Sequence, residues 1–498
     1  GITTVAGKYQ NDVQFLPEIY NSCVPILPAK NIYTPINRAV APSSTKGLGE
    51  WYANTCLPCL TGIRPTSFTP QNFWNNTSKI SEANIEAIED AILSKMLDVY
   101  DIDTSHLIYD ATNFFTFIDT MQNCELPKRG HNKEKRNDLR IVAMSLMVSP
   151  DFSIPLIHET YPGNMHDTKE FAVMMKRLKT RCQALTGKRT DVTVIFDRGN
   201  NSEDNIELLT SGDCPLHYVG GLKKNQASEL WAISKTEYTP LSGDSLAGQS
   251  AYRMSVDVYG QKVSAVIVYN PELEKGQMQG ILLNREKTAG KLLELQEKLM
   301  KRARGEIVKG RKPTCDSVTK AVEDILKVEY MKNIFSYEVI ESDNKLYLTF
   351  GASCEVLERI REETLGKTAL FTDRDDFSNE EIICAYRSAW HVEHAFRQMK
   401  DSKHLTVRPI FHWTDTQIRI HMFTCVLAYR LCCLLVKELS AKSIRITIDQ
   451  LINEMSRIKK VTTFLGDIEH PEKIESFIRG SEIAQAIEAA YDLKQKYS

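Results

Sequence analysis

The spacing of hydrophobic and polar positions along this chain changes near residue 104. Before that point, apolar residues recur at helical intervals in residues 48–60 and 81–100. Ser81 precedes the second stretch and is a suitable helix start, whereas the Pro- and Ser-rich residues 25–46 predict a loop. We therefore expect residues 1–103 to form a mostly helical N-terminal region.

From residue 104 to residue 227 the pattern is typical of strands, and later of strands that alternate with helices. Short apolar runs rich in β-branched and aromatic residues predict strands, and longer periodic runs predict helices. The predicted strands are 106–118, 139–148, 153–161, 191–197 and 216–224, and the predicted helices are 167–182 and 202–210. Three strands followed by an alternation of helix and strand favour an α/β fold, a mixed sheet flanked by helices.

Residues 228–375 interrupt that alternation. A hairpin at 252–269, a long charged helix at 283–304, a helix around 316–330 and a strand pair near 336–350 indicate an inserted α+β domain. The core resumes in residues 376–440, and a helical region at 441–498 ends the chain. The apolar run 422–436 contains Arg430 and is too short to span a bilayer, so it predicts a buried helix.

Composition adds little to this division, because 42% apolar and 25% charged residues are ordinary for a globular protein. The net charge is −2, but Lys and Arg are concentrated in residues 128–140 and 298–312. Each basic run indicates either a nucleic-acid contact or a solvated surface. The twelve cysteines are scattered, which favours reduced thiols and a cytoplasmic protein.

Three acids carry the candidate chemistry. Asp110 and Asp197 each follow the apolar part of a predicted strand, and Glu393 lies in the predicted helix 386–400. Two strand-borne aspartates and one glutamate can hold two divalent cations for phosphodiester chemistry. Their separations, 87 residues (197 − 110) and 196 residues (393 − 197), are not diagnostic.

Structural alternatives remain for two of these acids. Asp197 would also serve as a turn or helix cap before Arg198. The apolar neighbours of Glu393 predict partial burial, and helical spacing would also let it pair with Arg397, four residues on. Arg387 and Lys400 are further candidate partners.

The helix also carries a resemblance to a known family. Bacterial insertion-sequence transposases of the DDE class, in the insertion-sequence-four superfamily, share a signature of Tyr, two residues, Arg, three residues, Glu, six residues and Lys. Tyr386, Glu393 and Lys400 match this signature, and Ala389 stands where the family has Arg. The chain most resembles the branch with a long interruption before the glutamate. Further similar segments, in chain order, are SSTKGLGEWYANTCLP, PQNFWNNTSKI, IYDATNFF, YPGN, FDRGNNSEDN, YVGGLKKN and VRPIFHWTDTQIRIHMFTCVLAYRL.

The resemblance implies a fold, a site and partners. It implies an RNase H-like core, a catalytic and metal-binding triad of Asp110, Asp197 and Glu393, and two Mg²⁺ or Mn²⁺ ions. It also implies binding of double-stranded DNA, both terminal inverted repeats and target, by a homodimer in a synaptic complex, without a membrane. A bacterial, nucleoid-associated location and DNA-end binding by residues 1–103 follow from the same resemblance.

Candidate DNA contacts lie around the triad and elsewhere in the core. They are Tyr386, Arg387, Trp390, Arg397, Lys400, Lys223, Lys224 and Arg198. Trp390 and Trp231 would stack on an unpaired base, although a tryptophan in a helix more often packs in a core. A domesticated DNA-binding protein and a metal-dependent nuclease without strand transfer remain alternatives to a transposase. A nucleotide-binding ATPase is disfavoured, since the sequence has no GxxxxGK[ST] motif.

Overall fold

The computed structural model describes residues 33–55, 57–118, 123–130, 136, 138–186, 191–212, 214–401, 403–465 and 472–493. The chain folds as two compact units. The first unit comprises residues 1–220 and 385–498, and the second comprises residues 221–384. The second unit encloses the predicted insertion at 228–375.

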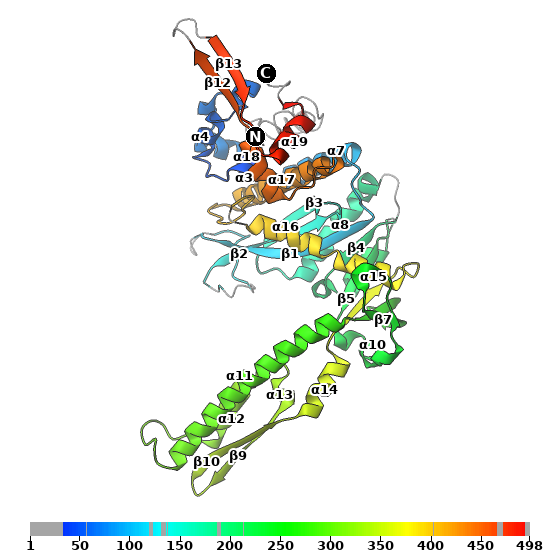
Figure 1. Ribbon diagram of the computed structural model, residues 1–498, viewed down its shortest axis with the longest axis vertical. Coiled ribbons are helices and arrows are strands. Elements are labelled where there is room, and N and C mark those ends of the chain that lie inside the picture. Colours follow the sequence, from blue (N-terminus) through cyan, green and yellow to red (C-terminus); the bar gives the residue numbers. More distant parts are fainter. Residues whose placement is uncertain are drawn as a thin grey trace. The chain divides into compact units, whose positions relative to one another are not determined.

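A mixed sheet forms the centre of the first unit (Figure 1). Its strands are β1 (His106–Thr116), β2 (Arg140–Val148), β3 (Pro155–Pro162), β4 (Thr193–Phe196) and β5 (His217–Leu222), in the order β3-β2-β1-β4-β5. The first three strands pair antiparallel, and β1, β4 and β5 pair parallel. Each predicted strand of this region is present within a few residues, so the prediction of a mixed sheet is confirmed.

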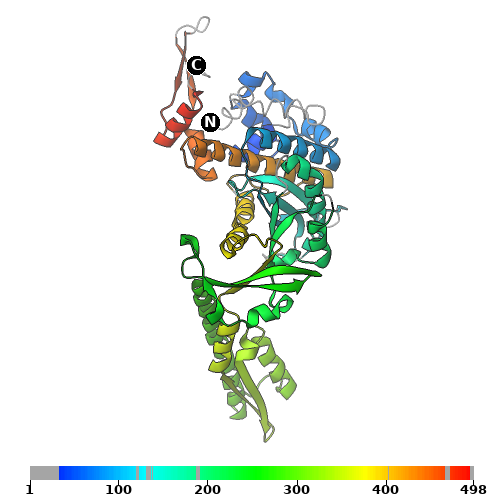
Figure 2. The same ribbon diagram turned by 90° about the vertical axis from the view of Figure 1, so that its right-hand side faces the viewer.

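Helices cover both faces of this sheet, as the predicted α/β layering requires. They include α8 (Asp167–Thr186) and α9 (Glu203–Thr210), which follow the predicted helices closely. The helix α16 (Trp390–Lys400) lies on the other side of the sheet from α8 (Figure 2). The flanked sheet therefore has one face covered by the helix that carries Glu393.

The N-terminal part of the first unit is helical, with one correction. Its helices are α3 (Tyr33–Val40), α4 (Leu48–Ala53), α5 (Leu57–Thr61), α6 (Pro70–Thr77) and α7 (Glu82–Val99). Ser81 caps α7 in a capping box with Asn84, as its position predicts. The expectation of a loop across residues 25–46 is wrong for 33–40, because Tyr33 and Ile36 bury an apolar face and convert this segment into a helix. Residues 25–32 lie outside the described part of the chain.

The helix α17 (Asp415–Ala441) contains the apolar run and is buried, as predicted. It is long and apolar enough to cross a membrane by length and composition, but 78% of its apolar window is buried inside the fold. Arg430 lies within this window and donates hydrogen bonds to the carbonyl oxygens of Pro155 and Leu156, at 2.8 and 3.0 Å. The helix therefore packs as a core element of the first unit.

The C-terminal region is not wholly helical, which corrects the prediction for residues 441–498. Between α18 (Ile448–Arg457) and α19 (Glu482–Ala490), the strands β12 (Lys460–Leu465) and β13 (Glu472–Phe477) pair antiparallel. The β-branched and aromatic residues in KVTTFL favour a strand over a helix. The expectation of reduced thiols is wrong for Cys214, which is disulfide-bonded. It is confirmed for the cysteines that are free in the described residues, namely Cys124, Cys315, Cys354, Cys384, Cys425, Cys432 and Cys433.

The second unit contains four further strands of the nine-stranded sheet and an arm. These strands are β6 (Thr239–Pro240), β7 (Ser250–Val258), β8 (Gln261–Tyr269) and β11 (Lys367–Thr372), and β7 and β8 are the predicted hairpin. The arm, residues 271–365, contains α11 (Pro271–Ala303), α12 (Cys315–Ile325), α13 (Met331–Ile334), α14 (Cys354–Glu363) and the hairpin of β9 (Phe335–Ser342) and β10 (Lys345–Ala352). The long helix begins twelve residues before its predicted start.

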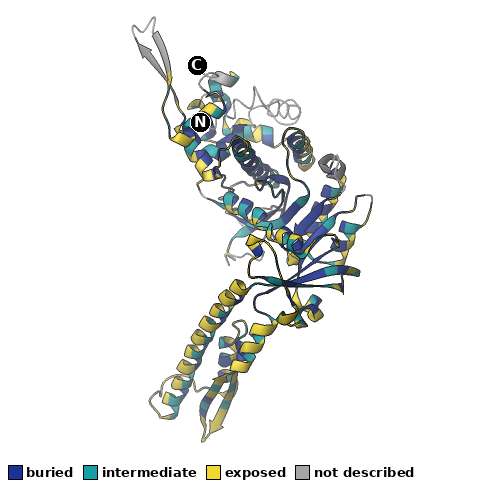
Figure 3. Cartoon of the chain, turned by 45° about the vertical axis from the view of Figure 1, so that its right-hand side comes forward, coloured by how far each residue is buried: buried dark blue, intermediate teal, exposed yellow. Residues whose placement is uncertain are grey.

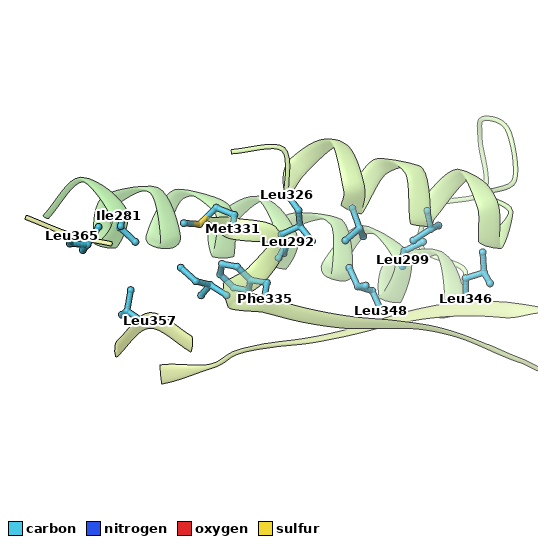
Figure 4. Close-up of a cluster of buried hydrophobic side chains, with 13 residues drawn as sticks. Ile281, Leu292, Leu299, Leu326, Met331, Phe335, Leu346, Leu348, Leu357 and Leu365 are labelled. Atoms are coloured by element: carbon cyan, nitrogen blue, oxygen red, sulfur yellow. The ribbon is translucent and has the colours of Figure 1, made fainter. Parts of the chain in front are cut away.

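The arm has its own hydrophobic core (Figure 4). Leu292 and Leu299 of α11, Val322 of α12, and Phe335 and Leu348 of the hairpin pack together in it. Much of the remaining surface of α11 is exposed (Figure 3). The arm is therefore a small packed body in which a hairpin and a short helix brace one long helix.

One buried carboxylate connects four elements of the first unit. Glu89 of α7 has no exposed surface and lies 2.7 Å from His158 Nδ1 of β3 and 3.2 Å from Nη2 of both Arg177 on α8 and Arg430 on α17. Burial alone raises the pKa of the Glu89 carboxyl, but His158, Arg430 and Arg177 outweigh burial and hold the pKa well below its usual range. The cluster therefore joins the helical region to the sheet edge.

Replacing Glu89 with Gln should destabilise the protein by about 3 kcal/mol or more, because Arg430 keeps its buried charge and loses its counterion. The folded pKa lies below the unfolded value, so this contribution is complete above about pH 5 and is lost as the pH falls toward the folded pKa. Urea unfolding at pH 7 and pH 4 measures both effects. Asp98→Asn, which alters an exposed carboxylate on the same helix away from this cluster, should cost less than about 0.5 kcal/mol. Equal losses in the two variants would contradict the role assigned to the buried cluster.

Candidate active site

The pairing of β1 with β4 brings Asp110 and Asp197 to the same level of the sheet. Ile108 pairs in parallel with Ile195, an offset of 87 residues, and the same offset relates Asp110 to Asp197 (197 − 110 = 87). Asp197 directly follows β4, and its backbone is still extended, with φ −80° and ψ 157°. Residues at the same level of neighbouring parallel strands point to the same face, so the two carboxylates are neighbours.

Tyr386 supports the second carboxylate. It lies in the last turn of α15 (Asn379–Arg387), and its hydroxyl donates a hydrogen bond of 3.2 Å to Asp197 Oδ1. Burial, followed by the charge and hydrogen bond of Asp197, raises the pKa of Tyr386, and Asp110 adds to the shift. The phenol therefore stays protonated at neutral pH and remains a donor to the site. Asp197 makes no side-chain cap bond to the turn after β4, so its position is not explained by capping.

Side-chain hydrogen bonds attach both ends of α16 to the sheet. At its start, His391 Nδ1 lies 2.8 Å from Ser153 Oγ in the β2–β3 connection. Near its end, Lys400 Nζ donates a hydrogen bond of 2.5 Å to Thr112 Oγ1 of β1 and lies 5.4 Å from the centre of the Phe114 ring. Thr112 is two residues after Asp110 and points to the same face of the sheet. The helix therefore packs over the face that presents Asp110.

Glu393 lies on the flank of α16 that also carries Lys400, beside the buried face of the helix. It precedes Lys400 by seven residues, about two helical turns, which places both side chains on one side of the helix. Contrary to the prediction of partial burial, Glu393 is exposed. Within the described residues its carboxylate has no ion pair or hydrogen bond, so pairing with Arg387, Arg397 or Lys400 does not explain it.

The segment 386–400 is not the single helix that its periodicity predicts. It divides between α15 and α16 at Ser388 and Ala389. Ser388 Oγ donates to the carbonyl oxygen of Ala385 at 2.6 Å, and the backbone bonds tighten to the three-residue type. A serine that bonds back to its own helix competes with the regular ladder. The break lies between Tyr386, which contacts Asp197, and Glu393.

Two of the three carboxylates, those of Asp110 and Asp197, are placed where they could bind a divalent cation together. Two like charges at one level of a sheet repel each other, a divalent cation between or beside them relieves that repulsion, and hard divalent cations prefer carboxylate oxygens. Asp110, Asp197 and the unpaired Glu393 have that chemistry. Across the described residues, however, no group of three His, Cys, Asp or Glu side chains is close enough to hold a metal. The structure brings the two aspartates together and leaves Glu393 outside their immediate group.

The other candidate DNA contacts of the first unit surround α16. Arg198 follows Asp197 and is exposed, Arg387 is exposed at the end of α15, and Arg397 Nη2 lies 2.8 Å from His394 Nδ1. Trp390 is 55% exposed, so packing in a core does not account for it. Its ring stacks on His391, with 3.8 Å between ring centroids. Their DNA contacts remain predictions.

The remaining candidates belong to the second unit. Lys223 and Lys224 are exposed, and Lys224 Nζ bonds to Thr364 Oγ1 at 3.2 Å and lies 3.7 Å from a Glu363 carboxylate oxygen. Trp231 is half-buried, and its carbonyl oxygen accepts a bond from Lys367. These contacts give Lys224 and Trp231 structural partners of their own.

Sequence reasoning missed an aromatic patch at the end of β1. Phe117, Phe411 and Trp413 are 53%, 61% and 60% exposed, and the first two rings lie 5.7 Å apart. The bridge between Thr116 and Ile410 brings the two segments together. The sequence carries no periodic signal for such a patch, because its members come from two loops that are almost 300 residues apart.

Comparison with known proteins gives one family. The model of the transposase DDE domain matches residues 102–431, a range that contains all three acids. No curated protein matches the chain. Among solved structures, one similar chain comes from the "Cryo-EM structure of piggyBac transposase synaptic complex with hairpin DNA (SNHP)". It has a TM-score of 0.42 and 9% identity, over 91% of this chain and 79% of that chain.

A metal-binding test follows from the paired carboxylates. Mn²⁺ at ten times its dissociation constant should stabilise the wild type by about 1.4 kcal/mol. It should not stabilise Asp110→Asn or Asp197→Asn, which each lack half of the pair. Without metal, either variant should be as stable as the wild type or up to about 1 kcal/mol more stable, since a like-charge repulsion is removed.

Thermal unfolding with and without Mn²⁺ measures these differences. Glu207→Gln changes an exposed helical glutamate on α9 and is the matched control, with a wild-type response to Mn²⁺. Asp197→Asn that unfolds at a much lower temperature without metal would contradict a metal-binding role and indicate a structural one.

Proposed function

Because the chain belongs to the transposase DDE domain family, with a match over residues 102–431, we propose that it cuts and joins DNA at the ends of a mobile element. In this proposal the enzyme cleaves at terminal inverted repeats and joins the 3′-OH ends to target DNA. Its core is of the RNase H type, and its branch is the insertion-sequence-four group with a long interruption before Glu393.

The observation that carries the proposal is the equal level of Asp110 and Asp197 on parallel strands, beneath the helix of Glu393. A phosphodiester is already anionic, and attack by water places further negative charge on it, so hydrolysis depends on stabilising that added charge. Neighbouring carboxylates are poor partners for an anionic phosphate unless cations accompany them. The pair therefore suits metal-assisted phosphoryl transfer far better than direct acid–base catalysis.

In this proposal the three acids bind the metal ions that the reaction needs. Asp110, Asp197 and Glu393 would hold two divalent cations, Mg²⁺ or Mn²⁺, which when bound activate a water and stabilise the leaving 3′ oxygen. The water oxygen attacks the phosphorus and the bond to the 3′ oxygen breaks, leaving a free 3′-OH. In the second step this 3′-OH attacks a phosphorus of target DNA, and the target's own 3′ oxygen leaves.

Other residues position the acids and the DNA. Tyr386 fixes the rotamer of Asp197 through its hydrogen bond, and the contacts of His391 and Lys400 hold α16 over the aspartates. Arg198, Arg387 and Arg397 are exposed cations near these residues, suited to phosphate oxygens. Exposed Trp390 offers a ring for an unpaired base at a cut end. The partners are duplex DNA and a second copy of the chain, in a bacterial cytoplasm.

A second function has one specific observation in its favour. The described residues hold no group of three potential ligands, which is what a domesticated DNA-binding descendant without catalysis would show. In the transposase account, Glu393 instead joins the aspartates when metal and DNA bind. A metal-dependent nuclease that cuts without joining uses the same acids and is distinguished by its products.

Cleavage and joining should require all three acids and a divalent metal. With duplex DNA that carries the element's inverted repeats and Mg²⁺ or Mn²⁺, the wild type should nick the repeat ends and form strand-transfer products. Asp110→Asn, Asp197→Asn and Glu393→Gln should each lower both products by at least about 1,000-fold, which corresponds to about 4 kcal/mol of activation free energy. Denaturing gel electrophoresis of labelled DNA measures nicks and joints together.

Glu207→Gln should cut and join like the wild type, as the control for loss of an exposed helical glutamate. DNA binding without cleavage by the wild type would support the domesticated protein instead. Nicking without joined products would support the nuclease, and full activity of Glu393→Gln would remove that residue from the site.

A further inference from the structure

We propose that the tip of the arm in the second unit is a binding site for the phosphate backbone of duplex DNA. The arm tip comprises residues 298–312, at the end of α11, and residues 343–345, at the turn of the β9–β10 hairpin. Figure 1 shows both segments at the same end of the arm. This inference takes DNA as the polyanion from the proposed function, and nothing in the catalytic account requires it.

Charge is concentrated at the arm tip, although the whole chain has a net charge of −2. The tip contains eight cations: Lys298, Lys301, Arg302, Arg304, Lys309, Arg311, Lys312 and Lys345. Its acids are Glu306 and Asp343. All of these cations are exposed except Arg302, which is half-buried. A local excess of this size, on a chain of nearly balanced charge, is the electrostatic footprint of a nucleic-acid contact.

The backbone folds these cations into one surface. Arg302 Nη2 donates to the carbonyl oxygen of Lys309 at 3.2 Å, which turns the loop back onto the helix. Gly310, with φ +97°, allows the turn that follows. Lys312 Nζ then bonds to Asn344 Oδ1 at 2.8 Å and joins the loop to the hairpin. The cations are therefore held together in space by neutral partners.

Local acids do not neutralise most of the patch. Lys301 pairs with Glu297 at 2.9 Å, and Arg304 lies 3.9 Å from Glu306. Within the described part of the chain, no acid lies within salt-bridge distance of Lys298, Arg302, Lys309, Arg311 or Lys312. Attraction to the helix dipole accounts for cations in the last turn of α11, such as Lys301 and Arg302. It does not account for Lys309, Arg311 and Lys312, which lie beyond the helix.

The length of the arm determines how far the tip lies from the strands of its unit. A helix of 33 residues spans about 50 Å, so the tip lies roughly that far from the sheet of its own unit. The packed core of the arm keeps this distance fixed. Phosphate contacts at such a distance add affinity and fix the direction of a duplex without reading its sequence.

Salt-dependent DNA binding tests this site. The triple variant Lys309→Gln, Arg311→Gln and Lys312→Gln should make the slope of log affinity against log salt less negative by about 2 to 3, since each lost phosphate contact removes about 0.9 from its magnitude. At 50 mM salt the affinity should fall by roughly tenfold or more. Fluorescence anisotropy with a 60-base-pair duplex, from about 50 to 200 mM salt, measures both.

A matched triple variant removes the same charge from the shaft of the same helix. Lys275, Lys287 and Lys291 are exposed on α11, and their replacement by Gln should leave the slope within about 0.5 of the wild type. Equal losses in the two triple variants would overturn a localised site, and an unchanged slope in the tip variant would overturn it altogether. A melting temperature within a few degrees of the wild type confirms that each variant is folded.

The cleavage assay, run on the same proteins, separates this inference from the proposed function. If the wild type cleaves DNA and the tip variant keeps the wild-type slope of log affinity against log salt, only the tip site is overturned. Tip-dependent binding without any metal-dependent cleavage supports the tip site and overturns only the proposed chemistry.

Discussion

The parallel pairing of β1 with β4 is the constraint on which the candidate active site depends. Because one register relates Ile108 to Ile195, it also sets Asp110 beside Asp197. A shift by one residue would turn one carboxylate to the opposite face, since side chains alternate along a strand. The repulsion between the carboxylates is then a structural cost that a bound cation would relieve. The fold holds this repulsive pair in place because the strands that carry it are buried on both faces.

Two sets of polar contacts hold the surroundings of this pair. The Glu89 cluster joins α7, β3, α8 and α17. Ser153 and Thr112 hold the two ends of α16. The first set is buried and charged, so it resists rearrangement. The second joins His391 to Ser153 and the half-buried Lys400 to Thr112, and it adds to the buried apolar face of α16. In the proposed function, the exposed Glu393 would join the pair when metal binds.

Much of the core could be predicted from the sequence, for physical reasons. Strands such as VTVIF and RIVAMSLMV are continuous apolar runs, because a sheet covered on both faces buries every side chain. The acids at Asp110 and Asp197 interrupt such runs, and that interruption was the signal for the site. The family resemblance supplied Glu393, which its own surroundings mark only weakly.

The remaining features arise from tertiary contacts. The break at Ser388 depends on a hydroxyl that bonds back to Ala385, and helical periodicity continues through it. The exposure of Trp390 depends on where α16 meets the sheet. The aromatic patch of Phe117 and Phe411 needs two distant loops to meet, and the arm tip needs Lys312 to reach Asn344. The spacing of residues along the chain gives no signal for these tertiary contacts.

A crystal structure of the protein soaked with Mn²⁺, with anomalous scattering used to locate the metal, shows directly whether Asp110 and Asp197 form a metal site. We expect an anomalous peak between Asp110 and Asp197, with their carboxylate oxygens about 2.1 to 2.3 Å from the ion and Glu393 turned toward it. An empty site at saturating Mn²⁺, or a metal bound only by residues elsewhere in the fold, would contradict this expectation.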